Sequence, residues 1–178
     1  MKKHTNLVNR VSQAAGFGAL TVLDAVVGVG CNLGDRLRTL KQAVARLGGL
    51  GEVRGVSLIY ETAPVGPPQP DYLNAAVRLE FDGEPGALLK ALIAIELEFG
   101  RVRLEKWGPR TLDLDILWIR DRVVHEADLV VPHPRMAERA FALLPLLDVA
   151  PDATHPVTGE PFIVPVYSTS DVRCLGPF

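Results

Sequence analysis

The order of strand-like and helix-like segments along the chain constrains its fold more than any other feature. Two segments carry apolar residues at helical spacing, and each lies between runs that are typical of β-strands. In chain order the six segments are a strand at 24–32, a helix at 35–47, strands at 52–62 and 72–81, a helix at 85–99 and a strand from Thr111 to Ile119. This order predicts an α+β fold, namely a ferredoxin-like antiparallel sheet (βαββαβ) with the helices packed on one face.

Local signals set the ends of these two helices. Asp35 is placed to cap the first helix, and the pair Gly48-Gly49 ends it. Pro85 suits the first turn of the second helix, and Gly100 follows its last turn.

The chain beyond residue 119 is expected to form a helical and loop C-terminal extension. Residues 120–136 predict a short excursion with two small edge strands. A third helix should start at His133-Pro134 and be limited by Pro145. The tail from Pro151 is rich in proline and turn residues, so we expect a loop with one strand at FIVPVY, residues 162–167.

Length and composition indicate one globular domain. The chain has 178 residues, 48% of them hydrophobic, and a net charge of −2, so neither a nucleic-acid partner nor a membrane surface is expected. No run reaches the ~18 apolar residues that a membrane span needs. Residues 1–23 predict a poorly ordered extension, and 24–178 predict one catalytic domain. Cys31 and Cys174 match neither a disulfide framework nor a zinc site, which favours a cytoplasmic protein.

Two aspartates in the last strand of the pattern carry the clearest chemistry. Asp113 and Asp115 stand at i and i+2, so both carboxylates point to one face. Aspartate is depleted from strands, and two like charges on one face repel each other unless a cation lies between them. The pair therefore favours a divalent metal site, for which Mg²⁺ fits best, over the alternative of a solvated strand end.

Basic and aromatic residues lead directly into this strand. The basic ones are Arg101, Arg103, Lys106 and Arg110. They either form a solvated loop or bind phosphate, and Trp107 either packs in the core or stacks on a ring of a substrate. No Walker A loop or kinase catalytic-loop sequence is present. The combination predicts a Mg-nucleotide site with a planar second substrate, and phosphoryl-type transfer without a covalent enzyme intermediate.

Two further features are ambiguous when they are taken alone. The proline-rich loop APVGPPQPD, residues 63–71, is either a stiff connection or the rim of a ligand site. Glu96 lies at the edge of the apolar stripe of its helix, where a surface or helix-pair carboxylate is the simpler interpretation.

Three motifs, in this order, give the chain a specific resemblance. They are ETAPVGPPQPDYLNA at 61–75, GRVR…KWGPRTLDLDIL at 100–117 and VPHPRMAERAF at 131–141. The chain resembles the 6-hydroxymethyl-7,8-dihydropterin pyrophosphokinase family over about residues 25–151. The resemblance implies transfer of pyrophosphate from ATP to the hydroxymethyl group of the pterin in folate biosynthesis, with attack on the β-phosphorus and release of AMP.

The resemblance also implies a role for each matching position. Asp113 and Asp115 would hold two Mg²⁺ ions together with ATP, and the catalytic residues would be Arg101, Arg103, Arg110, Asp113 and Asp115. ATP would be bound by Glu96, Arg101, Arg103, Trp107, Arg110, Ile116, His133 and Arg139. The pterin would be bound by Thr62, Ala63, Val65, Tyr72, Asn74, Trp107, Asp113 and Phe141.

Four positions depart from the family pattern, namely Cys31, Ala63, Leu104 and Lys106. They bear on the dynamics of the loops and the phosphate contacts and leave the aspartate pair intact. We expect a cytoplasmic monomer, with contact to another folate-pathway enzyme left open. Two alternative functions are a palm-like Mg-dependent nucleotidyltransferase and a non-catalytic small-molecule-binding module of ferredoxin-like fold.

Overall fold

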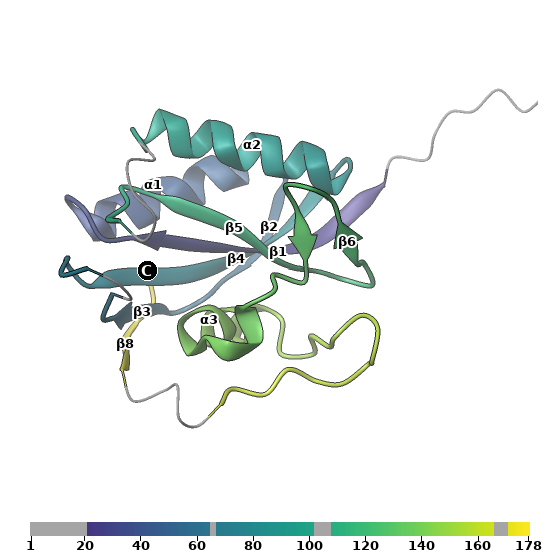
Figure 1. Cartoon of the computed structure of the whole chain (residues 1–178). Helices are drawn as coiled ribbons and strands as arrows, with labels where there is room; N and C mark the ends of the chain where they lie inside the picture. The colour runs from purple at the N-terminus through teal and green to yellow at the C-terminus, as the bar shows by residue number, and fades with distance from the viewer. Residues whose placement is uncertain (1–20, 65–66, 102–107, 166–170) are drawn as a thin grey trace, which may run out of the picture.

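The structure is a computed structural model that describes residues 21–64, 67–101, 108–165 and 171–178. Its centre is a six-stranded sheet in the order β5-β1-β4-β3-β8, with β2 also paired to β4 (Figure 1). The strands are β1 (Val22–Cys31), β2 (Glu52–Val56), β3 (Ile59–Thr62), β4 (Tyr72–Asp82), β5 (Asp113–Ile119) and β8 (Val172–Gly176). All of these pairings are antiparallel, as the order of segments predicts.

Helices α1 (Arg36–Gly48) and α2 (Pro85–Glu98) cover one face of the sheet (Figure 1). Asp35 caps α1 as predicted, because its side chain accepts a hydrogen bond from the backbone N–H of Arg38 at 3.1 Å. The apolar stripes of the two helices are buried against the odd-numbered residues of β1, which include Val27 and Val29. This is the larger of the two hydrophobic cores.

Helix α3 (Ala140–Val149), which was predicted as part of the C-terminal extension, lies on the face opposite to α1 and α2 (Figure 1). It packs with Leu143 and Leu146 against Ala76 of β4 and Trp118 of β5 in a second core. The central strands are therefore buried on both faces, and their apolar runs are too continuous to mark a single buried face.

The details of the C-terminal half also differ from the predicted ones. The third helix begins at Ala140 rather than at Pro134, after a 3-10 turn at Met136–Glu138, and it continues through Pro145. The two short strands β6 (Val124–His125) and β7 (Val130–Val131) pair with each other in a separate small sheet.

Two strand predictions need correction as well. The strand expected at 52–62 is split into β2 and β3, because Ser57 and Leu58 turn aside to bond with Ala76 O and the Asp148 carboxylate. Of the segment expected to form a strand at 162–167, the described residues 162–165 are not in a strand, and the last strand comes later, at β8. The strand β1 begins at Val22, while residues 1–20 of the predicted N-terminal extension lie outside the described residues. In the described part of the chain, no helix is long and apolar enough to cross a bilayer.

Candidate active site

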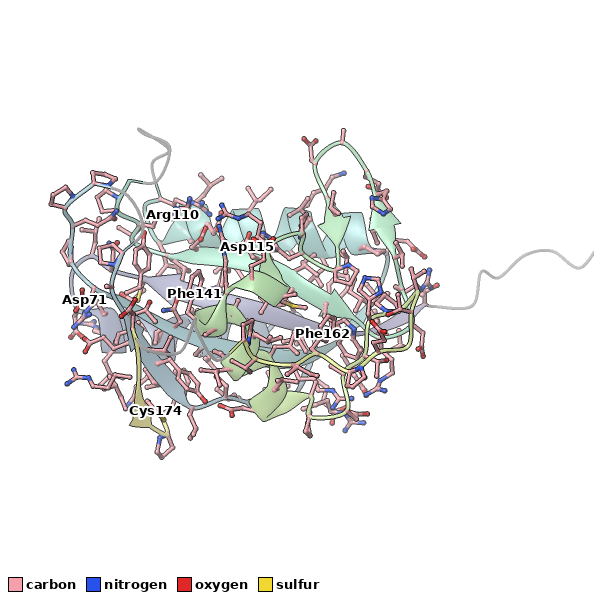
Figure 2. The ribbon with its side chains drawn as sticks, turned by 60° about the horizontal axis from the view of Figure 1, so that its bottom comes forward. Asp71, Arg110, Asp115, Phe141, Phe162 and Cys174 are labelled. Carbon is pink, nitrogen blue, oxygen red and sulfur yellow. The ribbon has the colours of Figure 1, made fainter. Side chains whose placement is uncertain are left out.

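A cavity of about 730 Å³ lies over the ends of β1, β4 and β5, on the face that also carries α3. The pairing of strands places Asp113, Gly30 and Asn74 in one row across this face. Gly30 forms the floor, since a Cβ there would come within 3.3 Å of Asn74 Oδ1. Figure 2 shows Asp115 on β5, Arg110 in the loop before this strand and Phe141 at the start of α3. The lining residues are Gly30, Thr62, Ala63, Pro64, Tyr72, Asn74, Arg110, Asp113, Asp115, His133, Arg135, Glu138, Arg139, Ala140, Phe141, Asp171 and Val172.

A second cavity, of about 540 Å³, lies between α2, the outer edge of β5 and the β6–β7 hairpin. Its lining includes Ile93 and Glu96 of α2 and Leu129 of the hairpin. Arg110, Asp113 and Asp115 line both cavities. The aspartate pair therefore stands where the two cavities meet, which is the arrangement that a transfer between two bound substrates requires.

The charges of the two aspartates are compensated unequally. Arg101 contacts Asp113 Oδ1 at 2.7 Å, and Arg110 forms an ion pair with the other oxygen of Asp113. Asp115 is exposed to the cavities, and partial desolvation by their walls raises its pKa, with repulsion from Asp113 as the second cause. Asp115 thus faces the cavities with a carboxylate that lacks such a compensating cation among the ion pairs of the described residues.

The residues fit a divalent cation in the chemistry of their donors. Two carboxylates share one face, and Asp113 Oδ1 is buried without a hydrogen bond of good geometry in the described structure, despite its ion pair with Arg101. Among the described residues no group of three or more His, Cys, Asp or Glu side chains converges, so protein ligands alone would leave a shell incomplete. Mg²⁺ ordinarily fills the remaining positions with water and substrate phosphate oxygens.

Glu96 is part of the site from the helix side. Its side chain is only 3% exposed, and it accepts a hydrogen bond from the backbone N–H of Leu114 at 2.7 Å and pairs with Arg101. Burial is the main cause that raises the pKa of Glu96, while Leu114 and Arg101 oppose it. A helix-surface carboxylate, the simpler interpretation of the sequence, does not describe this position.

Two basic residues, His133 and Arg139, line the cavity together with the aspartates, from the segment before α3. Burial lowers the pKa of His133 in spite of the nearby Asp115 carboxylate. Burial and the neighbouring Arg135 lower the pKa of Arg139, whose guanidinium lies 5.6 Å from the centre of the Phe141 ring. A desolvated guanidinium such as that of Arg139 binds phosphate well, because an anionic ligand offsets the cost of its burial.

The remaining rim has an aromatic and amide character. Asn74 donates to Thr62 Oγ1 at 2.9 Å, and Tyr72 donates to the backbone oxygen of Gly108 at 3.4 Å. Phe141 lines the same cavity from α3.

The structure brings together every predicted site residue that it describes, except one. Ile116 is buried in the larger core at 3% exposure and is not among the described residues that line the two cavities. Val65, Arg103 and Trp107 fall outside the described residues, as do Leu104 and Lys106. Of the other two departures from the family pattern, Cys31 is buried and burial raises its pKa to about 12, while Ala63 lines the first cavity.

Sequence reasoning missed Asn32, which connects two parts of the site. It is 1% exposed, and its side chain accepts a hydrogen bond from the backbone N–H of Arg110 at 2.8 Å. The same side chain donates to Gln69 Oε1 at 2.9 Å and to Pro70 O at 3.0 Å. The proline-rich loop is thereby tied to Arg110, in the loop just before β5. An asparagine directly after a buried strand was the available signal.

Comparison with known proteins identifies the family. Residues 26–151 match the family model described as 7,8-dihydro-6-hydroxymethylpterin-pyrophosphokinase (HPPK). A 2-amino-4-hydroxy-6-hydroxymethyldihydropteridine pyrophosphokinase of Synechocystis is 48% identical over 141 residues, which are 78% of this chain and 72% of that protein. The protein of the same name from Bacillus subtilis is 46% identical over 128 residues, 70% of this chain and 77% of that protein.

Longer proteins match over part of their length. The folic acid synthesis protein fol1 of Pneumocystis carinii is 38% identical over 135 residues, 75% of this chain and 18% of that protein. The crystal structure of wild-type HPPK-DHPS from Plasmodium falciparum with SDX-DHP has a TM-score of 0.62 at 16% identity, covering 80% of this chain and 43% of that one, and it supports the fold alone. With the family model matched over most of its length and two relatives above 45% identity, the chain belongs to the 7,8-dihydro-6-hydroxymethylpterin-pyrophosphokinase family.

Proposed function

We propose that this chain transfers the pyrophosphoryl group of ATP to the hydroxymethyl oxygen of 6-hydroxymethyl-7,8-dihydropterin, giving the pterin pyrophosphate and AMP in folate biosynthesis. The observation that carries the proposal is the position of Asp113 and Asp115, which line both cavities at their junction. Membership of the family supplies the identity of the two substrates. The acceptor would occupy the cavity beside Asn74, and the nucleotide the cavity beside Glu96.

Asp113 and Asp115 would hold two Mg²⁺ ions, which would neutralise charge on the phosphates of ATP. Arg101 and Arg110 now contact Asp113, and in the complex they would turn to the phosphate oxygens. His133 and Arg139 would bind the phosphates from the opposite side of the aspartate pair. The protein would therefore act through positioning and compensation of charge, and none of its side chains would bond covalently to the transferred group.

The acceptor half of the site suits a flat amino-pyrimidine ring. Phe141 and Tyr72 offer aromatic surfaces, with Thr62 and Ala63 at the ring edge. Asn74 already donates to Thr62, so its side-chain oxygen would accept from the ring. Four further residues complete the proposed site. Val65 and Trp107 would contact the pterin. Trp107, Arg103 and Ile116 would contact ATP, and Arg103 would also be catalytic.

The broader assignments are also proposals. The order β5-β1-β4 with β2 and β3 beyond supports a ferredoxin-like sheet, with α3, β8 and the connecting loops as a C-terminal extension. Residues 24–178 would form one catalytic domain, monomeric and cytoplasmic. The Plasmodium HPPK-DHPS structures suggest that a second folate-pathway enzyme is a suitable partner to test.

Identification of the nucleotide product tests this function. We expect AMP to form from ATP only when both Mg²⁺ and 6-hydroxymethyl-7,8-dihydropterin are present. Release of ADP would indicate ordinary phosphoryl transfer, and release of pyrophosphate would indicate a palm-like nucleotidyltransferase. Binding of the pterin without Mg-dependent turnover would instead indicate a non-catalytic module. Each of these three outcomes contradicts the proposal.

A further inference from the structure

The last strand of the sheet comes from a part of the chain that the family match does not cover. The match ends at residue 151, whereas β8 spans Val172–Gly176 and adds to the free edge of β3. Its register places Val172 opposite Thr62, Arg173 opposite Glu61 and Cys174 opposite Tyr60. Figure 2 shows Cys174 on this strand, at the edge of the sheet.

An ion pair and an apolar contact hold β8 in this register. Arg173 pairs with Glu61, and Arg36 at the start of α1 pairs with the other oxygen of Glu61 at 3.1 Å. The hydrogen bond from Arg173 is the main cause that lowers the pKa of Glu61. Phe178, two residues after the strand, packs against the larger core. The ion pair of Arg173 and the packing of Phe178 together hold β8 against β3.

The first residues of this segment line the larger cavity. Asp171 and Val172 belong to its lining together with Thr62 and Ala63, and the register places Val172 opposite Thr62. They therefore lie at the acceptor end of the cavity. Thr62, which accepts a hydrogen bond from Asn74, lies between them and Asn74. Neither residue is among the described residues that line the second cavity, the one proposed for the nucleotide.

We propose that β8 is an added wall of the acceptor cavity, in which Val172 and Asp171 contact the pterin ring and set the affinity for this substrate. This inference rests on the proposed function for the identity of the acceptor. Val172 would pack against the edge of the ring, as an aliphatic side chain can. The Asp171 carboxylate would accept a hydrogen bond from the amino-pyrimidine edge, which carries N–H donors.

Variants of the full-length chain test the wall. Val172→Ala and Asp171→Asn are compared with Leu175→Ala, a control on the same strand whose side chain is 47% exposed and does not line either cavity in the described structure. Titration calorimetry with 6-hydroxymethylpterin, in the presence of Mg²⁺ and α,β-methylene-ATP, gives the affinity for the acceptor. A separate titration with the nucleotide analogue gives the affinity for ATP, and thermal melting reports on the fold.

We expect each of the two wall variants to weaken pterin binding about fivefold, a loss typical of removing one contact from a pocket. Nucleotide binding, the melting temperature and all properties of Leu175→Ala should be unchanged. Unaltered pterin affinity in both variants would overturn the inference, as would an equal loss of affinity for both ligands. A wild-type chain that binds the pterin but forms no AMP would count against the proposed reaction, and the affinities of the variants would still decide the role of the wall.

Discussion

Asp115 and Asp113 are equivalent in the sequence motif but not in the folded site. Asp113 pairs with Arg101 and Arg110, while Asp115 faces the junction of the cavities, where desolvation and the charge of Asp113 raise its pKa. Two arginines therefore compensate the charge of Asp113, whereas Asp115 has no such partner among the ion pairs of the described residues. The i, i+2 spacing in the sequence predicts only that the two carboxylates share one face of the strand.

Replacement of Asp115 by asparagine should remove activity while the fold is kept. The amide has nearly the same shape but binds a hard divalent cation poorly, so we expect AMP formation to fall by at least about 10²-fold, the loss found when one key electrostatic group is removed from a site. The melting temperature should not fall. Asp82→Asn, at the exposed end of β4, is the matched control and should keep full activity. Substantial turnover by the Asp115 variant would disprove the metal assignment.

Asn32 should matter for stability as well as for activity. Asn32→Ala leaves the partly buried backbone N–H of Arg110 without this acceptor and removes the hydrogen bonds to Gln69 and Pro70, so we expect the free energy of unfolding to fall by about 1–3 kcal/mol. Urea unfolding measures this loss. Gln69→Ala removes one of these bonds from the other end and should cost clearly less. Equal losses in the two variants would mean that the link to Arg110 contributes nothing.

At the scale of elements, sequence patterns predict what local spacing determines and miss what tertiary pairing determines. The stripes of α1 and α2 and the Asp35 cap were predicted, because periodicity and capping are local. Pro145 was expected to limit α3, yet the helix continues through it, since packing of Leu143 and Leu146 stabilises the turns on both sides. The position of β8 could not be predicted, because it depends on a free edge that exists only in the folded sheet.

The connection from α1 to β2 gives a test at this scale. A Cβ on Gly51 would lie 2.1 Å from the backbone oxygen of Glu80, whereas a Cβ on Gly48 would make an ordinary 3.7 Å contact with Val53. Gly51→Ala should therefore destabilise the protein by roughly 1–3 kcal/mol, as overpacking does. Gly48→Ala, in the last turn of α1, should be neutral or stabilising because alanine is the better helix former. Thermal melting of the two variants distinguishes them, and a Gly51 variant as stable as the Gly48 one would refute the close approach.

For the whole molecule, charged residues join the sheet to the C-terminal half at the end away from the site. Asp24 lies six residues before Gly30 on β1, a separation of about 20 Å along a strand. It accepts from Arg78 of β4 at 2.7 Å and from Arg120 after β5 at 2.8 Å, and Arg120 also bonds to Asp152 beyond α3. The Asp24 carboxylate thus links the central strands to one another. Through Arg120 it also links them to the loop beyond α3, which belongs to the second face.

This network should make stability depend on pH. The hydrogen bond from Arg78 is the main cause that lowers the pKa of Asp24 in the folded state. A depressed carboxyl pKa contributes stability that is full above the unfolded value, near about 4, and is lost as the pH falls through the folded value. We expect Asp24→Asn to be about 1–2 kcal/mol less stable than wild type at pH 7, a difference that shrinks below about pH 4. Chemical unfolding from pH 7 to pH 2.5 measures it, with Asp82→Asn as a control that should run parallel to wild type.

The most direct test of the central claim follows each phosphorus atom of ATP through the reaction. ³¹P NMR of a mixture of the wild-type chain, Mg²⁺, ATP and 6-hydroxymethyl-7,8-dihydropterin identifies which phosphates reach the acceptor. The account predicts that the β and γ phosphorus atoms move together to the pterin and that the α phosphorus remains in AMP, with no such transfer by Asp115→Asn. Movement of the γ phosphorus alone, or transfer that persists in the Asp115 variant, would contradict it.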